Sequence, residues 1–143
     1  MTTRTGFAAV LATVLAAFAT PATLAREPAA AGAEVYIVAP RDGAKIKGPV
    51  TVVFGLKGMG VAPAGIRMEN TGHHHLLIDT DPPADLSQPL PANEKVVHFG
   101  KGQTETTLTL PSGRHTLQLV LGDSLHIPHD PAVVSKKITI TVE

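Results

Sequence analysis

Most of the seven histidines in this chain fall in two short clusters, and their chemistry is the most informative feature of the sequence. The first cluster is the run His73, His74 and His75, and the second is the pair His126 and His129. Imidazole titrates near neutral pH and binds zinc, copper and nickel. Because the chain contains no cysteine, a metal bound here would be held by nitrogen rather than by thiolate. Metal binding is therefore the first function to consider.

Residues 1–25 have the pattern of a cleavable export signal. Arg4 supplies a positive start, residues 7–19 are almost wholly apolar, and residues 21–25 form a small-residue exit. The apolar stretch is too short to span a bilayer comfortably. We predict cleavage after Ala25, with a later site within residues 29–33 as the alternative. The processed protein is then expected to be soluble and either periplasmic or secreted.

Charge and composition argue against several classes of partner. The whole chain has 12 Lys and Arg against 12 Asp and Glu, so removing Arg4 with the signal leaves a net charge near −1. The basic residues are scattered, which disfavours nucleic acid and an anionic membrane surface as partners. Residues 26–33 are rich in Ala, Pro and Gly and are predicted to be a flexible tether. A single domain is expected over residues 34–143.

The rest of the chain alternates apolar and polar residues between turn signals, which is typical of short β-strands. Seven such runs in about 110 residues favour an all-β fold, an immunoglobulin-like antiparallel β-sandwich. The expected strands are Glu34–Ala39, Pro49–Leu56, His73–Asp79, Val96–Phe99, Thr104–Leu110, Arg114–Leu121 and Val133–Val142.

This topology predicts where the histidines meet. Successive strands reverse direction, so the second-to-third, fourth-to-fifth and sixth-to-seventh connections lie at one pole. Alternation places His73 and His75 on one face of their strand, which Asp79 marks as the more solvated face, and His74 on the core face. Asp123 and Asp130 are candidates to orient imidazole N–H groups. The hypothesis is a copper or zinc site whose ligands come from His73, His75, His98, His126 and His129.

Other interpretations of the same residues stay open. The polar histidines could form a structural, hydrogen-bonded cap in a non-catalytic interaction module, with a protein partner at the proline-rich loop 80–95. Asp123, Ser124 and His126 are triad residue types, but they lie in one loop without a nucleophile elbow, so no enzyme activity is predicted. His115, at the far end of the sandwich, is expected to be a structural corner residue that bonds backbone.

Three segments also resemble a known family, domain of unknown function 4399, a small exported bacterial domain. They are the stretches Gly72–Asp79, His98–Glu105 and Leu121–Pro131, within a similarity that runs from about Val35 to Val142. The resemblance implies an exported protein of the predicted fold class. It implies no biochemical role, so the metal hypothesis depends on the predicted geometry alone.

Overall fold

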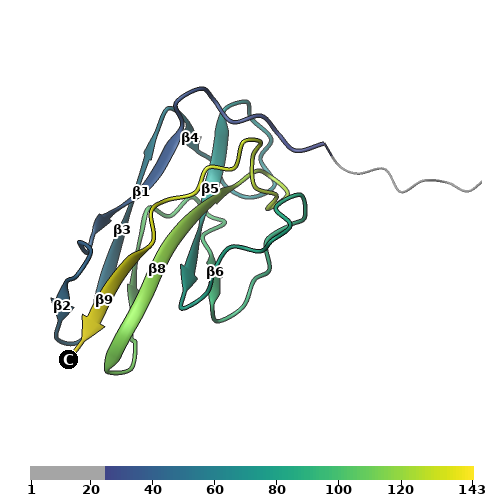
Figure 1. Ribbon diagram of the computed structural model, residues 1–143. Coiled ribbons are helices and arrows are strands. Elements are labelled where there is room, and N and C mark those ends of the chain that lie inside the picture. The colour runs from purple at the N-terminus through teal and green to yellow at the C-terminus, as the bar shows by residue number, and fades with distance from the viewer. Residues whose placement is uncertain (1–24) are drawn as a thin grey trace, which may run out of the picture.

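The structure is a computed structural model that describes residues 25–143 (Figure 1). The predicted export signal, apart from Ala25, lies outside the described residues. Within the described part of the chain, no helix is long and apolar enough to cross a membrane.

The chain forms an immunoglobulin-like β-sandwich of two sheets, as the alternation predicted. The smaller sheet has the order β1-β3-β7, and the larger has the order β2-β9-β8-β5-β4 with β6 paired to β5. All seven predicted strands are present, with ends that differ by a few residues. The structure adds two short strands, β2, which pairs in parallel with β9, and β4, which pairs in parallel with β5. The strands are β1 Glu34–Ala39, β2 Lys45–Ile46, β3 Val50–Lys57, β4 Gly60–Val61, β5 Thr71–Ile78, β6 Val96–His98, β7 Glu105–Leu108, β8 Gly113–Gly122 and β9 Ile138–Val142.

The core lies between the two sheets and comes from alternate residues of each strand. Val52 and Phe54 of β3 face Leu76 of β5 and Leu119 of β8, and all four side chains are buried. Register explains this arrangement, because Leu76 pairs with Leu119 and their side chains therefore point to the same face of the sheet. Burying each such side chain contributes about 1.5–3 kcal/mol, which holds β5 and β8 in place under the histidines.

The opposite face of β5 is also buried, which corrects the expectation that it is the more solvated one. Leu77 of β5 and Val120 of β8 pack on this face against Leu90 and Val96, forming a second, smaller apolar cluster. Leu90 belongs to the loop after β5, and its N–H donates to the carbonyl of His126. The proline-rich loop 79–95 thus folds back over the sheet and covers the face that carries His73 and His75.

Three loops meet at one pole of the sandwich, as predicted from the strand directions. The N–H of Ala64, in the β4–β5 loop, donates to the carbonyl of Gly100 in the turn after β6. The N–H of Gly65 donates to the carbonyl of Ser124, in the loop after β8. These two bonds tie the connections together and so fix the walls around the histidines.

His115 at the far pole is a structural corner residue, as its position predicted. Its Nε2 lies 2.8 Å from the carbonyl oxygen of Pro111, and its Nδ1 lies 2.7 Å from Oδ2 of Asp79. The hydrogen bond to Asp79 is the main reason that the pKa of His115 is raised above 6.5. With both nitrogens donating, the ring is best accommodated as the imidazolium.

The hydrogen-bonded pair of His115 and Asp79 is expected to give a small pH dependence of the unfolding free energy. Because the folded pKa of His115 is raised, the stabilisation is complete below the unfolded value of 6.5 and is lost as the pH rises through the folded pKa. The pair is near the surface, so we expect an effect of at most about 1 kcal/mol. Urea unfolding of the wild type and of His115→Gln between pH 6 and pH 9 measures it. If the difference in unfolding free energy between the wild type and His115→Gln does not change with pH over this range, the expectation is contradicted.

Candidate metal centre

Four histidines from three separate parts of the chain converge on the covered face of β5. They are His73, His75, His98 and His126, and each can present one ring nitrogen such that all four nitrogens lie within 4.8 Å of one another. The centroids of every pair of these rings are 4.5–5.7 Å apart. We call this set the four-histidine cluster.

Strand pairing explains how the cluster forms. His73 and His75 are two residues apart on β5, so their side chains leave the same face of the strand. His75 pairs with His98 of the antiparallel strand β6, which places both rings on that face. His126 comes from the loop after β8, and β8 also pairs with β5. One of the remaining two rings therefore comes from a strand paired with β5, and the other comes from the loop that follows another such strand.

The rings are buried, yet several of their nitrogens have no hydrogen-bond partner. His73 is 0% exposed and His75 is 1% exposed. Within the described residues, both ring nitrogens of His75, Nδ1 of His73 and Nε2 of His98 are buried and unpartnered. In the same cluster, His73 Nε2 and His126 Nδ1 are 3.1 Å apart and share one hydrogen. Leaving a buried polar atom without a partner costs about 1–3 kcal/mol.

Two glycines make room for the rings. A β-carbon on Gly122 would lie 2.6 Å from Cε1 of His75, and one on Gly100 would lie 2.3 Å from the His98 ring. Any side chain at either position would therefore displace an imidazole. The backbone around the cluster is shaped to accept these two rings in these orientations.

The electrostatics of the cluster keep the imidazoles neutral. Burial, followed by the nearby His126 and His98, lowers the pKa of His73 to about 4. Burial, followed by His73 and His98, lowers the pKa of His75 to about 3. Burial also lowers the pKa of His98. At neutral pH these rings are therefore in the uncharged form, whose lone pair can bind a metal.

The loop that carries His126 is held by its own hydrogen bonds. Oδ1 of Asp123 accepts from the N–H groups of Leu125 and Ile127, at 2.8 and 2.9 Å. Asp123 therefore shapes the backbone rather than orienting an imidazole, contrary to the role predicted for it. Asp130 is 68% exposed and pairs with Arg26, so it does not have that role either. An Asp early in a loop commonly accepts a hydrogen bond from the backbone N–H two residues on, and this is the signal that could have revealed the role of Asp123.

Two other histidines at this pole lie outside the cluster. His129, one of the five candidate ligands, has its Nε2 3.1 Å from the carbonyl oxygen of Thr71. Its ring lies next to Gly72, beside Leu121 on the core face of β5. His74 also points into the core, as predicted, and its ring is 5.1 Å from that of Phe54. The structure therefore brings together four of the five candidates and leaves His129 on the other side of the strand.

Comparisons with known proteins identify a family and name no activity. No curated protein matches this chain. A similar solved structure is that of fibronectin(III)-like modules of CbhA from Clostridium thermocellum, with 12% sequence identity and a TM-score of 0.41 over 76% of this chain and 92% of that one. The profile of the domain of unknown function DUF4399 matches residues 52–143, which include the whole four-histidine cluster. The chain is therefore a member of the DUF4399 family.

Proposed function

We propose that this protein binds one copper or zinc ion outside the cytoplasm through the four-histidine cluster. The observation that carries the proposal is the set of buried, unpartnered ring nitrogens that converge within 4.8 Å. Four imidazole nitrogen donors without a thiolate suit copper or zinc. The export signal predicted for residues 1–25 is the support for placing the protein in the periplasm or outside the cell.

The dimensions of the cluster fit a metal ion after a small closure. A tetrahedral zinc ion has metal–nitrogen distances of about 2.0–2.1 Å, so its donors lie roughly 3.4 Å apart. Nitrogens now within 4.8 Å would close by at most about 1.4 Å. His98 ends a short strand, and the His126 ring can turn about its side-chain bonds on its loop, so these two rings can close on the metal while the backbone of His73 and His75 stays fixed in β5.

The structural-cap interpretation accounts for one ring nitrogen of His129, which bonds a backbone carbonyl. Buried ring nitrogens without a partner also occur in His74 and at Nδ1 of His129, so they do not by themselves set the cluster apart. What supports binding at the cluster is that its nitrogens converge within 4.8 Å of one another. We propose binding rather than catalysis, because the carboxylate of Asp123 bonds backbone N–H groups of its own loop instead of the His126 ring. A protein partner at the proline-rich loop 80–95 stays a separate proposal.

Calorimetry on metal-free protein tests the proposal directly. We expect Cu(II) or Zn(II) to bind at one ion per chain with a Kd below about 1 μM. His73→Ala and His126→Ala should each weaken binding by about 100-fold, a loss of roughly 2.7 kcal/mol, because each removes one donor. His129→Ala is the matched control and should bind like the wild type. A wild-type Kd weaker than about 100 μM, or binding unchanged by both donor substitutions, would reject the site.

A further inference from the structure

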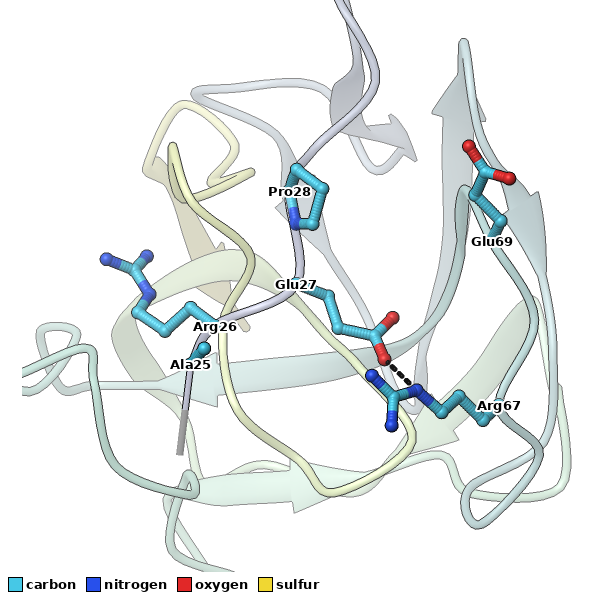
Figure 2. Close-up of a pocket in the computed structure, with 6 residues that line it drawn as sticks. All are labelled: Ala25, Arg26, Glu27, Pro28, Arg67 and Glu69. Atoms are coloured by element: carbon cyan, nitrogen blue, oxygen red, sulfur yellow. Dashed lines mark ion pairs between the residues drawn. The ribbon is translucent and has the colours of Figure 1, made fainter. Parts of the chain in front are cut away.

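The N-terminal residues of the described chain grip the loop that follows His126. Arg26 donates from Nε to the carbonyl of Pro128 at 2.9 Å, and from Nη2 to the carbonyl of His129. Its Nη1 lies 3.5 Å from Oδ1 of Asp130, and the Arg26 side chain is only 21% exposed. In Figure 2 this side chain points away from Glu27, toward the opposite side of the backbone. One guanidinium thus contacts three consecutive residues of the loop.

Further contacts extend this grip along the chain. The N–H of Ala29 donates to the carbonyl of Asp130, and the N–H of Asp130 donates to the carbonyl of Glu27. On the other side, Glu27 pairs with Arg67 of the β4–β5 loop at 2.9 Å, as the dashed line in Figure 2 marks. Residues 26–30, which we call the N-terminal strap, therefore lie beside residues 128–130 and are joined to them by an isolated parallel bridge between Pro28 and Asp130. The segment predicted to be a flexible tether is docked over this part of its length.

The loop that the strap contacts reaches the four-histidine cluster through Gly122. Pro128 forms a β-bridge with Gly122, the residue over which the ring of His75 lies. A β-carbon on Gly122 would be 3.3 Å from the carbonyl carbon of His126. The strap, Pro128, Gly122 and the backbone of His126 thus form one continuous set of contacts.

His126 needs such support because its backbone is in an unfavourable conformation. Its φ is 68°, in the left-handed region that residues with a β-carbon seldom occupy. A residue of this kind keeps its conformation only where its surroundings hold it. Asp123 bonds the backbone N–H groups of the residues on either side of His126, and the strap bonds the backbone that follows, at Pro128.

We propose that the N-terminal strap is a positioning element of the metal centre, with Arg26 as its main positioning residue. The proposal rests on the proposed function of the cluster. By fixing residues 128–130, the strap keeps the His126 ring beside the other three before the metal arrives, so less entropy is lost on binding. The strap lies outside residues 52–143, so it is a feature of this chain beyond the region that matches the family.

The first test measures metal affinity in matched arginine variants. Arg26→Ala should weaken binding by about tenfold, the lower end of the effect of removing a group that supports a ligand. Arg26→Lys keeps the positive charge near Asp130, but its ammonium group lacks the planar guanidinium that donates to two carbonyls at once. It should therefore recover only part of the metal affinity. Arg114→Ala, at the far pole, removes an exposed arginine and should leave the Kd unchanged. Competition against a chelator of known affinity gives each Kd.

The second test uses the reciprocity of coupled equilibria. If the strap raises metal affinity tenfold, the metal must stabilise the docked strap by the same factor. Hydrogen exchange at the N–H groups of Ala29 and Asp130 should therefore slow by about tenfold when metal is added to the wild type. The N–H groups of Gly43 and Thr141, which bond backbone carbonyls at the other pole, should change much less. A merely structural strap would show no such response, and this measurement does not depend on whether a variant folds.

The outcomes separate the two proposals. Suppose that the wild type binds metal, that Arg26→Ala binds it equally well, and that the hydrogen-exchange rate of the Ala29 N–H is unchanged by metal. The strap proposal is then wrong and the cluster proposal stands. If Arg26→Lys binds metal as tightly as the wild type, the positive charge alone accounts for the effect on the loop, and the role given to the two hydrogen bonds of the Arg26 guanidinium is wrong. If the wild type binds no metal, both proposals fail together. Weakened binding in Arg26→Ala together with metal-dependent exchange at Ala29 and Asp130 supports the strap.

Discussion

Replacing His75 with leucine is expected to weaken metal binding by at least about 100-fold, while stabilising the metal-free protein by about 1–3 kcal/mol. His75 is 1% exposed, and neither of its ring nitrogens has a hydrogen-bond partner within the described residues. Leucine has a similar volume and no polar atom to satisfy, so the metal-free fold gains what the buried nitrogens cost. Opposite changes in affinity and stability are the pattern expected of a residue retained for binding.

The control for this substitution is another buried histidine at the same pole. His129 is also 1% exposed, but its Nε2 bonds the carbonyl of Thr71. His129→Leu should therefore destabilise the protein, because it leaves that carbonyl without its donor, and should leave metal affinity within about threefold of the wild type. Urea unfolding and calorimetry on the two variants decide between them. Destabilisation by His75→Leu comparable to that by His129→Leu would argue that His75 serves the fold instead.

The sandwich was predictable from the sequence because each strand carries its own evidence. Alternation in β3 and β8 assigns Val52, Phe54 and Leu119 to the core, and the structure buries all three. Reversal of direction between successive strands then places the loops that carry the histidines at one pole. Neither inference needs knowledge of which strand pairs with which, and both are confirmed.

The details of the cluster depend on pairing that local patterns do not encode. His98 joins the cluster because β6 pairs with β5, and no feature of residues 96–98 selects that neighbour over another strand. His129 lies on the core face because the loop after β8 crosses the end of the sandwich between His126 and His129. Two residues so close in the sequence are interchangeable as candidate ligands until that path is known.

Long loops account for the other differences. The prediction of a solvated face relied on Asp79, which is exposed, whereas the loop after it returns to pack on Leu77, which lies on the same face as His73 and His75. Packing of Leu90 against Leu77 and Val120 drives this cover, and such contacts between distant residues leave no periodic signal. Docking of residues 26–30 is equally non-local, since it depends on carbonyl groups of residues 128 and 129.

The burial of the histidines leads to a further expectation, that the metal-free protein unfolds steeply in mild acid. Burial lowers the pKa of His73 and His74 to about 4 and that of His75 to about 3, against 6.5 for an unperturbed ring. Between pH 6.5 and pH 4 the unfolded chain therefore binds protons that the native protein does not, so stability falls as the pH falls. Three such groups give a slope of roughly 2–4 kcal/mol per pH unit, set against a total stability of about 5–15 kcal/mol. We expect an acid midpoint near pH 5, measured by circular dichroism.

His74 allows this effect to be separated from metal binding, because it lies in the core and outside the four-histidine cluster. His74→Leu removes one of the three proton-linked groups, so the slope below pH 6.5 should fall by about 1.4 kcal/mol per pH unit and the midpoint should move to lower pH. His115→Gln is the matched control, since the raised pKa of His115 acts above pH 6.5 and leaves this range unchanged. Unfolding free energies that stay level between pH 7 and pH 4 in the wild type would mean that the buried rings take up protons without unfolding. Water would then have more access to the cluster than the packing of Leu77, Leu90 and Val120 implies.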